Sequence, residues 1–226
     1  MSDPQPLAAV LFDMDGLLVS TEETWFEVET VLMRELGADW GPEHQAALVG
    51  GPLEHSAQYM LTVAGRTDIA PAVIAMALLD RMEAALRRGP VAWMPGAREL
   101  LLEVRAAGLP TALVSSSYRR VMDAVLDSVG SEHFSATVSA DDVARTKPNP
   151  EPYLAGARAL GVDAGRCVAL EDSATGATAA RAAGCITVAV PSVAQVDPAI
   201  PHVVVGSLAD IDLGWLRRLA DQHLAA

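Results

Sequence analysis

The chain has 226 residues, of which 51% are hydrophobic, and a formal net charge of −13. This length allows one large domain, or a domain with a smaller one attached, and the apolar content allows a sizeable core. The acidity argues against a nucleic-acid partner, because phosphate backbones attract faces rich in Lys and Arg, and solubility is its simplest explanation.

No apolar run reaches the ~18 residues that a membrane span needs, so we expect no membrane partner. Residues 1–6 lack the basic-then-apolar layout of a secretory signal. Cys167 and Cys185 lie in apolar stretches without metal-ligand or CxxC spacing, which favours two buried, reduced thiols over a disulfide. We therefore expect a cytoplasmic protein, with a monomer as the default state.

Six short apolar runs are typical of strands, and most are continuous, as in strands that are covered on both faces. Helical patterns separate the later runs, and a glycine suited to capping follows each helix. This alternation predicts an α/β fold with a doubly wound, parallel, Rossmann-like sheet. The strands are expected at 8–12, 110–114, 136–139, 167–170, 186–190 and 202–205, the helices at 96–107, 118–129, 150–160 and 173–183, and the capping glycines are Gly108, Gly130, Gly161 and Gly184.

The segment after the first strand interrupts this rhythm, because it contains helical patterns at 22–36, 42–49, 53–64 and 69–88 and no convincing strand. We interpret it as a small all-helical cap domain covering residues 20–89, inserted into a core domain formed by residues 1–19 and 90–226. The expected hinges are 18–20 and 89–95, the second of which is rich in Pro and Gly.

The first strand ends in Asp13-Met14-Asp15-Gly16. Chance alone gives about one Asp-x-Asp pair in a chain with 16 aspartates, and Asp210-Ile211-Asp212, which we interpret as a surface turn or helix cap, is such a pair. Asp13 and Asp15 differ from it because they follow an apolar strand directly, and the carboxyl ends of parallel strands line the ligand crevice of an open sheet. Two neighbouring carboxylates repel unless a cation neutralises them, which predicts a magnesium site with a further carboxylate at another strand end.

Glu171 and Asp172 meet that expectation, because they follow the predicted strand at 167–170. Alone, they could simply place negative charge at the start of a helix. Ser115, Ser116 and Ser117 follow another strand, where hydroxyl and backbone N–H groups suit an anion. We expect Ser117 to cap the next helix, which leaves Ser115 and Ser116 to bind a phosphate.

Lys147 is the single lysine of the chain, beside 15 arginines, and it lies between Thr146 and Pro148. A bias toward arginine would leave a lysine mainly where arginine cannot replace it. A compact ammonium group is a standard phosphate ligand, so we assign Lys147 to phosphate binding rather than to a solvated loop.

Together these segments resemble the haloacid dehalogenase superfamily, and most closely its β-phosphoglucomutase-like branch, which has a helical cap after the first strand. The resemblance covers nearly the whole chain. It rests on Asp13-Met14-Asp15-Gly16, Ser115, Lys147-Pro148 and Leu170-Glu171-Asp172-Ser173 with Gly176.

The resemblance implies a role for each residue. Asp13 would attack phosphorus and form an aspartyl phosphate, and Asp15 would protonate the leaving alkoxide and then deprotonate the attacking water. Mg²⁺ would be held by Asp13, the Asp15 carbonyl and Asp172, with Glu171 nearby. Asp15 also separates this chain from the dehalogenase and phosphonatase branches, which lack it.

The cap favours a phosphatase over a mutase. Leu53, shortly after Gly50, stands where the mutases carry an arginine for a second phosphate, and Trp25 stands where they carry a histidine. Trp25, Gly50 and Leu53 are therefore candidates for contacting the substrate, although Trp25 is equally consistent with packing inside the cap. We expect a hydrolase that acts on a small sugar or polyol phosphate; a phosphosugar mutase and a catalytically idle binding protein are the alternatives.

Overall fold

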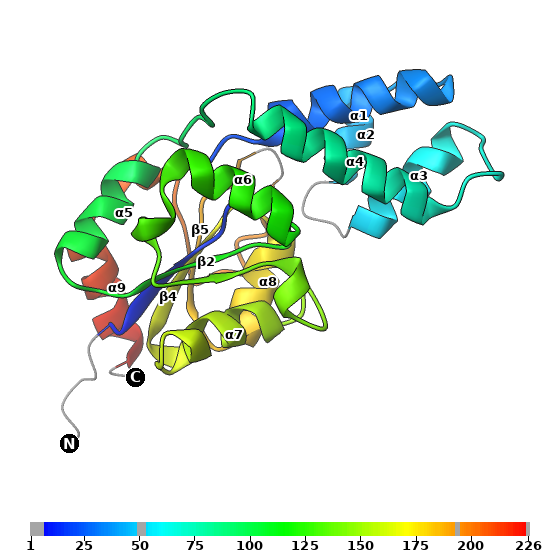
Figure 1. Ribbon diagram of the computed structural model, residues 1–226. Coiled ribbons are helices and arrows are strands. Elements are labelled where there is room, and N and C mark those ends of the chain that lie inside the picture. The colour runs from blue at the N-terminus through cyan, green and yellow to red at the C-terminus, as the bar shows by residue number, and fades with distance from the viewer. Residues whose placement is uncertain (1–6, 49–52, 193–194, 225–226) are drawn as a thin grey trace.

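The computed structural model describes residues 7–48, 53–192 and 195–224. At its centre is a parallel six-stranded sheet with the strand order β3-β2-β1-β4-β5-β6 (Figure 1). Every predicted strand is present, with its ends within one residue of those expected, so the doubly wound α/β prediction is confirmed. The strands are β1 (Ala9–Phe12), β2 (Thr111–Val114), β3 (Ala136–Val138), β4 (Cys167–Glu171), β5 (Ile186–Ala189) and β6 (Val203–Val204).

Alternate residues of β1 face two different helical layers. Val10 and Phe12 join the larger cluster of buried hydrophobic side chains, which includes residues of α5 (Ala97–Ala106), α6 (Arg119–Val129) and α9 (Leu213–Leu224). Ala9 and Leu11 join a second cluster with α7 (Glu151–Ala159) and α8 (Ala174–Ala182). Both faces of the central strand are buried, which explains its continuous apolar sequence.

The helices α5, α6, α7 and α8 begin and end within one residue of their predicted positions. The glycines after α5, α6, α7 and α8 all have positive φ, as their predicted capping role requires. The structure adds short 3₁₀ turns at Ser131–His133, Ala140–Asp142, Ala164–Arg166 and Leu208–Asp210. It also adds α9, which was not predicted, and Asp212 caps this helix by accepting a hydrogen bond from the Trp215 N–H at 2.6 Å.

Four helices follow β1 and lie together beside the sheet (Figure 1). They are α1 (Glu22–Leu36), α2 (Pro42–Ala46), α3 (Leu53–Val63) and α4 (Pro71–Leu86). The predicted helix at 69–88 begins later than expected because Pro71 occupies its first turn and holds Ala70 in an extended conformation. The helix predicted at 42–49 is wrong in length, since α2 ends at Ala46.

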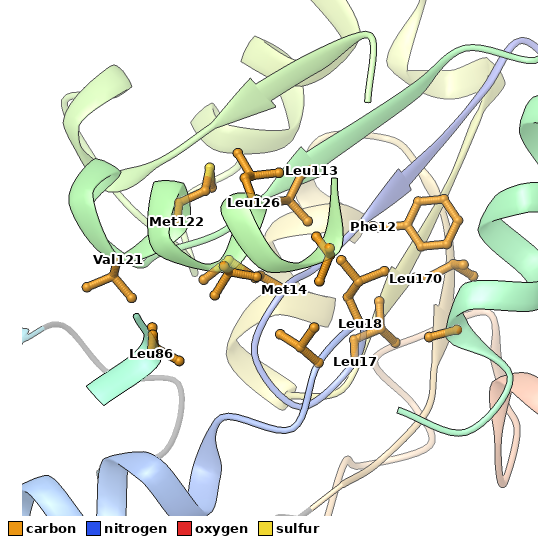
Figure 2. Close-up of a cluster of buried hydrophobic side chains, with 14 of the residues drawn as sticks. Phe12, Met14, Leu17, Leu18, Leu86, Leu113, Val121, Met122, Leu126 and Leu170 are labelled. Atoms are coloured by element: carbon orange, nitrogen blue, oxygen red, sulfur yellow. The ribbon is translucent and has the colours of Figure 1, made fainter. Parts of the chain in front are cut away.

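The two segments that join these helices to the sheet run side by side. The Ser20 N–H donates to the Ala92 carbonyl at 2.8 Å, and the Met94 N–H donates to the Leu18 carbonyl at 3.0 Å. Hydrophobic packing continues across this junction, and Figure 2 shows Leu86 of α4 near Val121 of α6. The helices α1–α4 are thus fastened to the α6 side of the sheet.

Charged side chains add to this junction. The Arg120 guanidinium on α6 donates to Glu83 at 2.6 Å and to Asp80 at 2.7 Å, both on α4.

Cys167 and Cys185 are buried and free, as predicted. Among the described residues, no helix is both long enough and apolar enough to cross a lipid bilayer.

Candidate active site

The register of the sheet brings Asp13 to the ends of two neighbouring strands. Phe12 pairs with Leu113 of β2 and with Leu170 of β4, and the Asp13 N–H donates to the Leu170 carbonyl at 3.0 Å. Gly16 then turns the chain with a φ of 77°. A Cβ atom on Gly16 would lie 2.1 Å from the Asp172 carboxylate, so only glycine lets this turn pass so close to β4.

Three carboxylates meet at this point. Asp13, Glu171 and Asp172 are buried, and each offers an oxygen within 4.8 Å of the others. Burial, followed by repulsion from Glu171, raises the pKa of Asp13 well above its usual range, and the same two causes raise the pKa of Asp172 to about 7. Buried carboxylates that repel one another in this way favour a bound cation.

Within the described part of the chain, Lys147 is the only residue that forms ion pairs with these three carboxylates. Its ammonium group donates to Asp13, to Glu171 at 2.5 Å and to the Val114 carbonyl at 2.9 Å. Burial opposes the charged form of Lys147, but Asp13 and Glu171 outweigh it and raise its pKa. One ammonium against three carboxylates leaves two formal negative charges, and these oxygen donors fit a hard divalent cation.

Glu171 is fixed by Ser173 and Gly176 of its own motif and by Tyr153, which the sequence did not reveal. The buried Tyr153 hydroxyl of α7 donates to Glu171 Oε1 at 2.6 Å, and the hydroxyl of Ser173 donates to Oε2 at 3.2 Å. A Cβ atom on Gly176 would lie 1.9 Å from Glu171 Oε1, which explains a glycine in the first turns of α8. Both Glu171 oxygens are therefore occupied by the protein.

Asp172 also has a partner that the sequence did not reveal. The Ser192 hydroxyl, in the loop after β5, donates to Asp172 Oδ2 at 2.5 Å. This hydrogen bond favours the charged carboxylate, although burial and Glu171 have the larger effect on its pKa. Ser192 thus holds one Asp172 oxygen, and no described residue donates a hydrogen bond to the other.

Asp15 lies apart from the three carboxylates and is held by hydroxyl groups. Thr21 donates to Asp15 Oδ1 at 2.6 Å, while Ser117 and Ser115 donate to Oδ2 at 2.8 and 3.3 Å. The prediction that Ser117 caps the following helix is wrong. Tyr118 occupies the cap position without a side-chain hydrogen bond, and the Ser117 hydroxyl donates to Asp15 instead.

Ser116 differs from its neighbours. Its hydroxyl is buried, lines the pocket and lacks a hydrogen-bond partner among the described residues. An unpaired buried hydroxyl is costly, and a phosphate oxygen would satisfy it. Ser115 is less free, because its oxygen already accepts the Ser117 N–H at 2.9 Å and donates to Asp15.

These groups form the floor of a pocket of about 960 Å³, including its open mouth. Asp13, Asp15, Ser115, Ser116, Lys147 and Asp172 line it, and Glu171 lies behind them. The walls come from α1–α4 and include Trp25 and Leu53, as expected, together with Glu22, Glu29 and Ser56. Gly50 lies outside the described residues. The structure thus brings the predicted residues together, while their chemical roles stay predictions.

Known proteins resemble the chain over most of its length. It is 32% identical over 232 residues to hexitol phosphatase B from Escherichia coli K12, covering 99% of each chain. It is 28% identical to the crystal structure of CbbY from Rhodobacter sphaeroides in complex with phosphate, covering 93% of this chain and 99% of that one, with a TM-score of 0.84. The complex of a CbbY mutant with xylulose-(1,5)bisphosphate gives a TM-score of 0.82 at the same identity and coverage.

The family model for haloacid dehalogenase-like hydrolases matches residues 7–184, which include the strands and side chains that build this site. The resemblance based on the sequence motifs is therefore confirmed. With this match and the likeness to a full-length relative, the chain belongs to the haloacid dehalogenase-like hydrolase family.

Proposed function

We propose that this protein is a Mg²⁺-dependent phosphomonoester hydrolase that acts on a small sugar or polyol phosphate. The observation that carries the proposal is the pocket floor, where Asp13, Lys147 and the unpaired Ser116 hydroxyl surround a space open to substrate. The names of relatives support the substrate class, since hexitol phosphatase B and validoxylamine A 7′-phosphate phosphatase are 32% and 30% identical to this chain.

In the proposed reaction, a carboxylate oxygen of Asp13 attacks phosphorus while the bond to the leaving oxygen breaks. Asp15 gives a proton to that leaving oxygen. The three hydroxyls around Asp15 hold its carboxyl group in place for this transfer. Asp15 then takes a proton from the water that attacks the aspartyl phosphate, which restores Asp13 and releases inorganic phosphate.

The phosphoryl oxygens would be held by Lys147, Ser116 and the backbone N–H groups that follow Ser115. Asp13, Asp172 and the Asp15 carbonyl would bind Mg²⁺, with Glu171 orienting Lys147. The bound cation would supply positive charge against the phosphoryl oxygens as charge spreads over them in the transition state. We also propose that residues 20–89 act as the cap on a core of residues 1–19 and 90–226.

The wall of the pocket favours hydrolysis over phosphoryl transfer between two positions of a sugar. A mutase must hold a second phosphate in the cap, and the cap side chains lining this pocket include acidic, apolar and neutral polar groups but no Arg or Lys within the described residues. The shared pocket of Asp13, Asp15, Lys147 and Asp172 supports an enzyme over an idle binding protein.

The test is release of phosphate from p-nitrophenyl phosphate and from a panel of sugar and polyol phosphates, with Mg²⁺ and with EDTA. We expect turnover that requires Mg²⁺ and that is lost in Asp13→Asn. Full activity of Asp13→Asn, or inactivity toward the whole panel with Mg²⁺ present, would contradict the proposal. Interconversion of glucose 1-phosphate and glucose 6-phosphate would favour the mutase instead.

A further inference from the structure

The cap side of the pocket carries polar groups that the proposed reaction does not use. Glu22, Trp25 and Glu29 follow helical spacing on α1, which places them on one face of that helix, and all three line the pocket. Ser56 of α3 lines it as well. Together these four residues, which we call the cap wall, face the groups that would attack a phosphate.

Glu29 is held in an environment that is costly for a carboxylate. Its side chain lies in the packed interior of the cap with 6% of its surface exposed, and burial raises its pKa to about 7. The Trp40 N–H donates to Glu29 Oε2 at 3.0 Å, and no other described residue donates to this carboxylate. The second oxygen, Oε1, is therefore available to a ligand.

The Trp40 donor is itself held in place. Its ring stacks on His44 with 4.8 Å between centroids, and His44 Nδ1 lies 2.9 Å from the Tyr59 hydroxyl. Burying a carboxylate costs free energy, and a hydrophobic residue at this position would pack in the apolar cap without that cost. The arrangement fits a carboxylate kept for binding.

Two further cap groups lack hydrogen-bond partners for their side-chain oxygens among the residues that the structure describes. Ser56 is 8% exposed, and its hydroxyl makes no hydrogen bond within the described part of the chain. The Glu22 carboxylate also makes no hydrogen bond there, although Gln45 donates to the Glu22 backbone carbonyl at 2.7 Å and so fixes the start of α1. Burial and the nearby Asp15 raise the pKa of Glu22 to about 7.

The charge of this wall restricts what can bind against it. Among the described residues that line the pocket, Lys147 is the single basic one, and it lies on the floor against Asp13 and Glu171. A second phosphate or a carboxylate on the substrate would meet Glu22 and Glu29, and the like charges would repel one another. Alcohol hydroxyls, in contrast, can donate to carboxylates and pair with the Ser56 hydroxyl.

We propose that Glu22, Glu29 and Ser56 form the leaving-group subsite, which binds adjacent hydroxyls of a neutral polyhydroxy alcohol and excludes phosphate esters that carry a second anionic group. This inference rests on the proposed function and narrows its substrate class to monophosphates of neutral polyols and sugars. Trp25 supplies the apolar face of the same subsite, and Trp40 is a positioning residue that acts through Glu29.

The experiment compares three phosphate esters at about pH 8, where carboxyl groups of pKa about 7 are mostly ionised. Sorbitol 6-phosphate offers hydroxyls, p-nitrophenyl phosphate offers none, and fructose 1,6-bisphosphate adds a second anion. We expect kcat/KM for sorbitol 6-phosphate to exceed that for the bisphosphate by at least about tenfold.

Glu22→Gln and Glu29→Gln keep the shape of each side chain and remove its charge. Each should lower kcat/KM for sorbitol 6-phosphate about tenfold more than it lowers kcat/KM for p-nitrophenyl phosphate, because a hydrogen bond to a charged group is lost only with the substrate that carries hydroxyls. The matched control is Glu27→Gln, because Glu27 lies on the same helix with its side chain exposed. It should change neither substrate.

The comparison between substrates separates recognition from folding. A purely structural loss would lower hydrolysis of both monoesters together, and that result in both variants would overturn the assignment. Equal turnover of the monophosphate and the bisphosphate by the wild-type protein would also overturn it. Failure of the wild-type protein to hydrolyse p-nitrophenyl phosphate with Mg²⁺ would instead refute the proposed function on which the assignment rests.

Discussion

Replacing Lys147 with methionine tests how far its ammonium group compensates the negative charge of Asp13, Glu171 and Asp172. The substitution keeps an unbranched side chain and removes an ammonium group that is 4% exposed and bonded to Asp13, Glu171 and the Val114 carbonyl. Removing one partner of a buried ion pair costs about 3–5 kcal/mol, because it leaves the other charge uncompensated. We therefore expect Lys147→Met to lose about that much free energy of unfolding in metal-free buffer.

The assay is urea unfolding followed by circular dichroism, first with EDTA and then with excess Mg²⁺. Since a divalent cation would take over part of the compensation, Mg²⁺ should stabilise Lys147→Met more than it stabilises the wild-type protein. The control is Arg158→Met, which removes an exposed cation on α7 and should cost less than about 0.5 kcal/mol. The reasoning is refuted if Lys147→Met unfolds within about 1 kcal/mol of the wild-type protein in EDTA.

Two further predictions concern other parts of the core. Gly176→Ala should abolish hydrolysis, since its Cβ atom would lie 1.9 Å from Glu171 Oε1 and must displace that carboxylate; crystal structures of the variant would show the shift, and unchanged kcat/KM would contradict it. Burial and then Arg181 lower the pKa of His202 to about 4 from 6.5, so the unfolded chain binds a proton first and stability falls as the pH drops from 6.5 toward 4. Because solvent screens this partly exposed ring, the loss of unfolding free energy should be on the order of 1 kcal/mol. The variant His202→Asn can still accept the Thr187 N–H, and urea unfolding at each pH should show that it lacks this loss. An equal loss in both proteins would contradict the assignment of the pH dependence to His202.

The strand positions could be predicted from the sequence because each strand is a short apolar run that ends in a polar residue or a turn. The parallel register then decides which of those ends meet, and it brings Asp13 beside Glu171 and Asp172, as predicted. Lys147 could be assigned because it is the single lysine of the chain. These predictions depend on local patterns and on the alignment of parallel strands.

The residues that support the site have no such local signal. In the sequence, Tyr153 resembles an ordinary core residue of an amphipathic helix. Its hydroxyl reaches Glu171 only because α7 packs against the sheet. Ser192 reaches Asp172 from a loop after another strand. Ser117 was misassigned because its position before a helix is typical of a cap, whereas its contact with Asp15 depends on the pairing of β1 with β2.

The residues of the cap wall also lack a local sequence signal for a role in binding. Glu22 and Glu29 resemble the polar residues of any amphipathic helix, and acidic residues in a first turn are common. A role for them can be proposed only from the structure, because they line the same pocket as Asp13 and Asp15 and because the Trp40 N–H donates to Glu29. Specificity therefore has to be inferred from the tertiary structure, whereas the chemistry follows from the motifs.

The central claim is that Asp13 carries the phosphoryl group during turnover. The most direct test is mass spectrometry of acid-quenched protein after brief reaction with p-nitrophenyl phosphate and Mg²⁺, using Asp15→Asn to slow hydrolysis of the intermediate. We predict one added phosphoryl group on the peptide that contains Asp13, and none in Asp13→Asn. A phosphoryl group on another residue, or hydrolysis that continues in Asp13→Asn, would contradict the account.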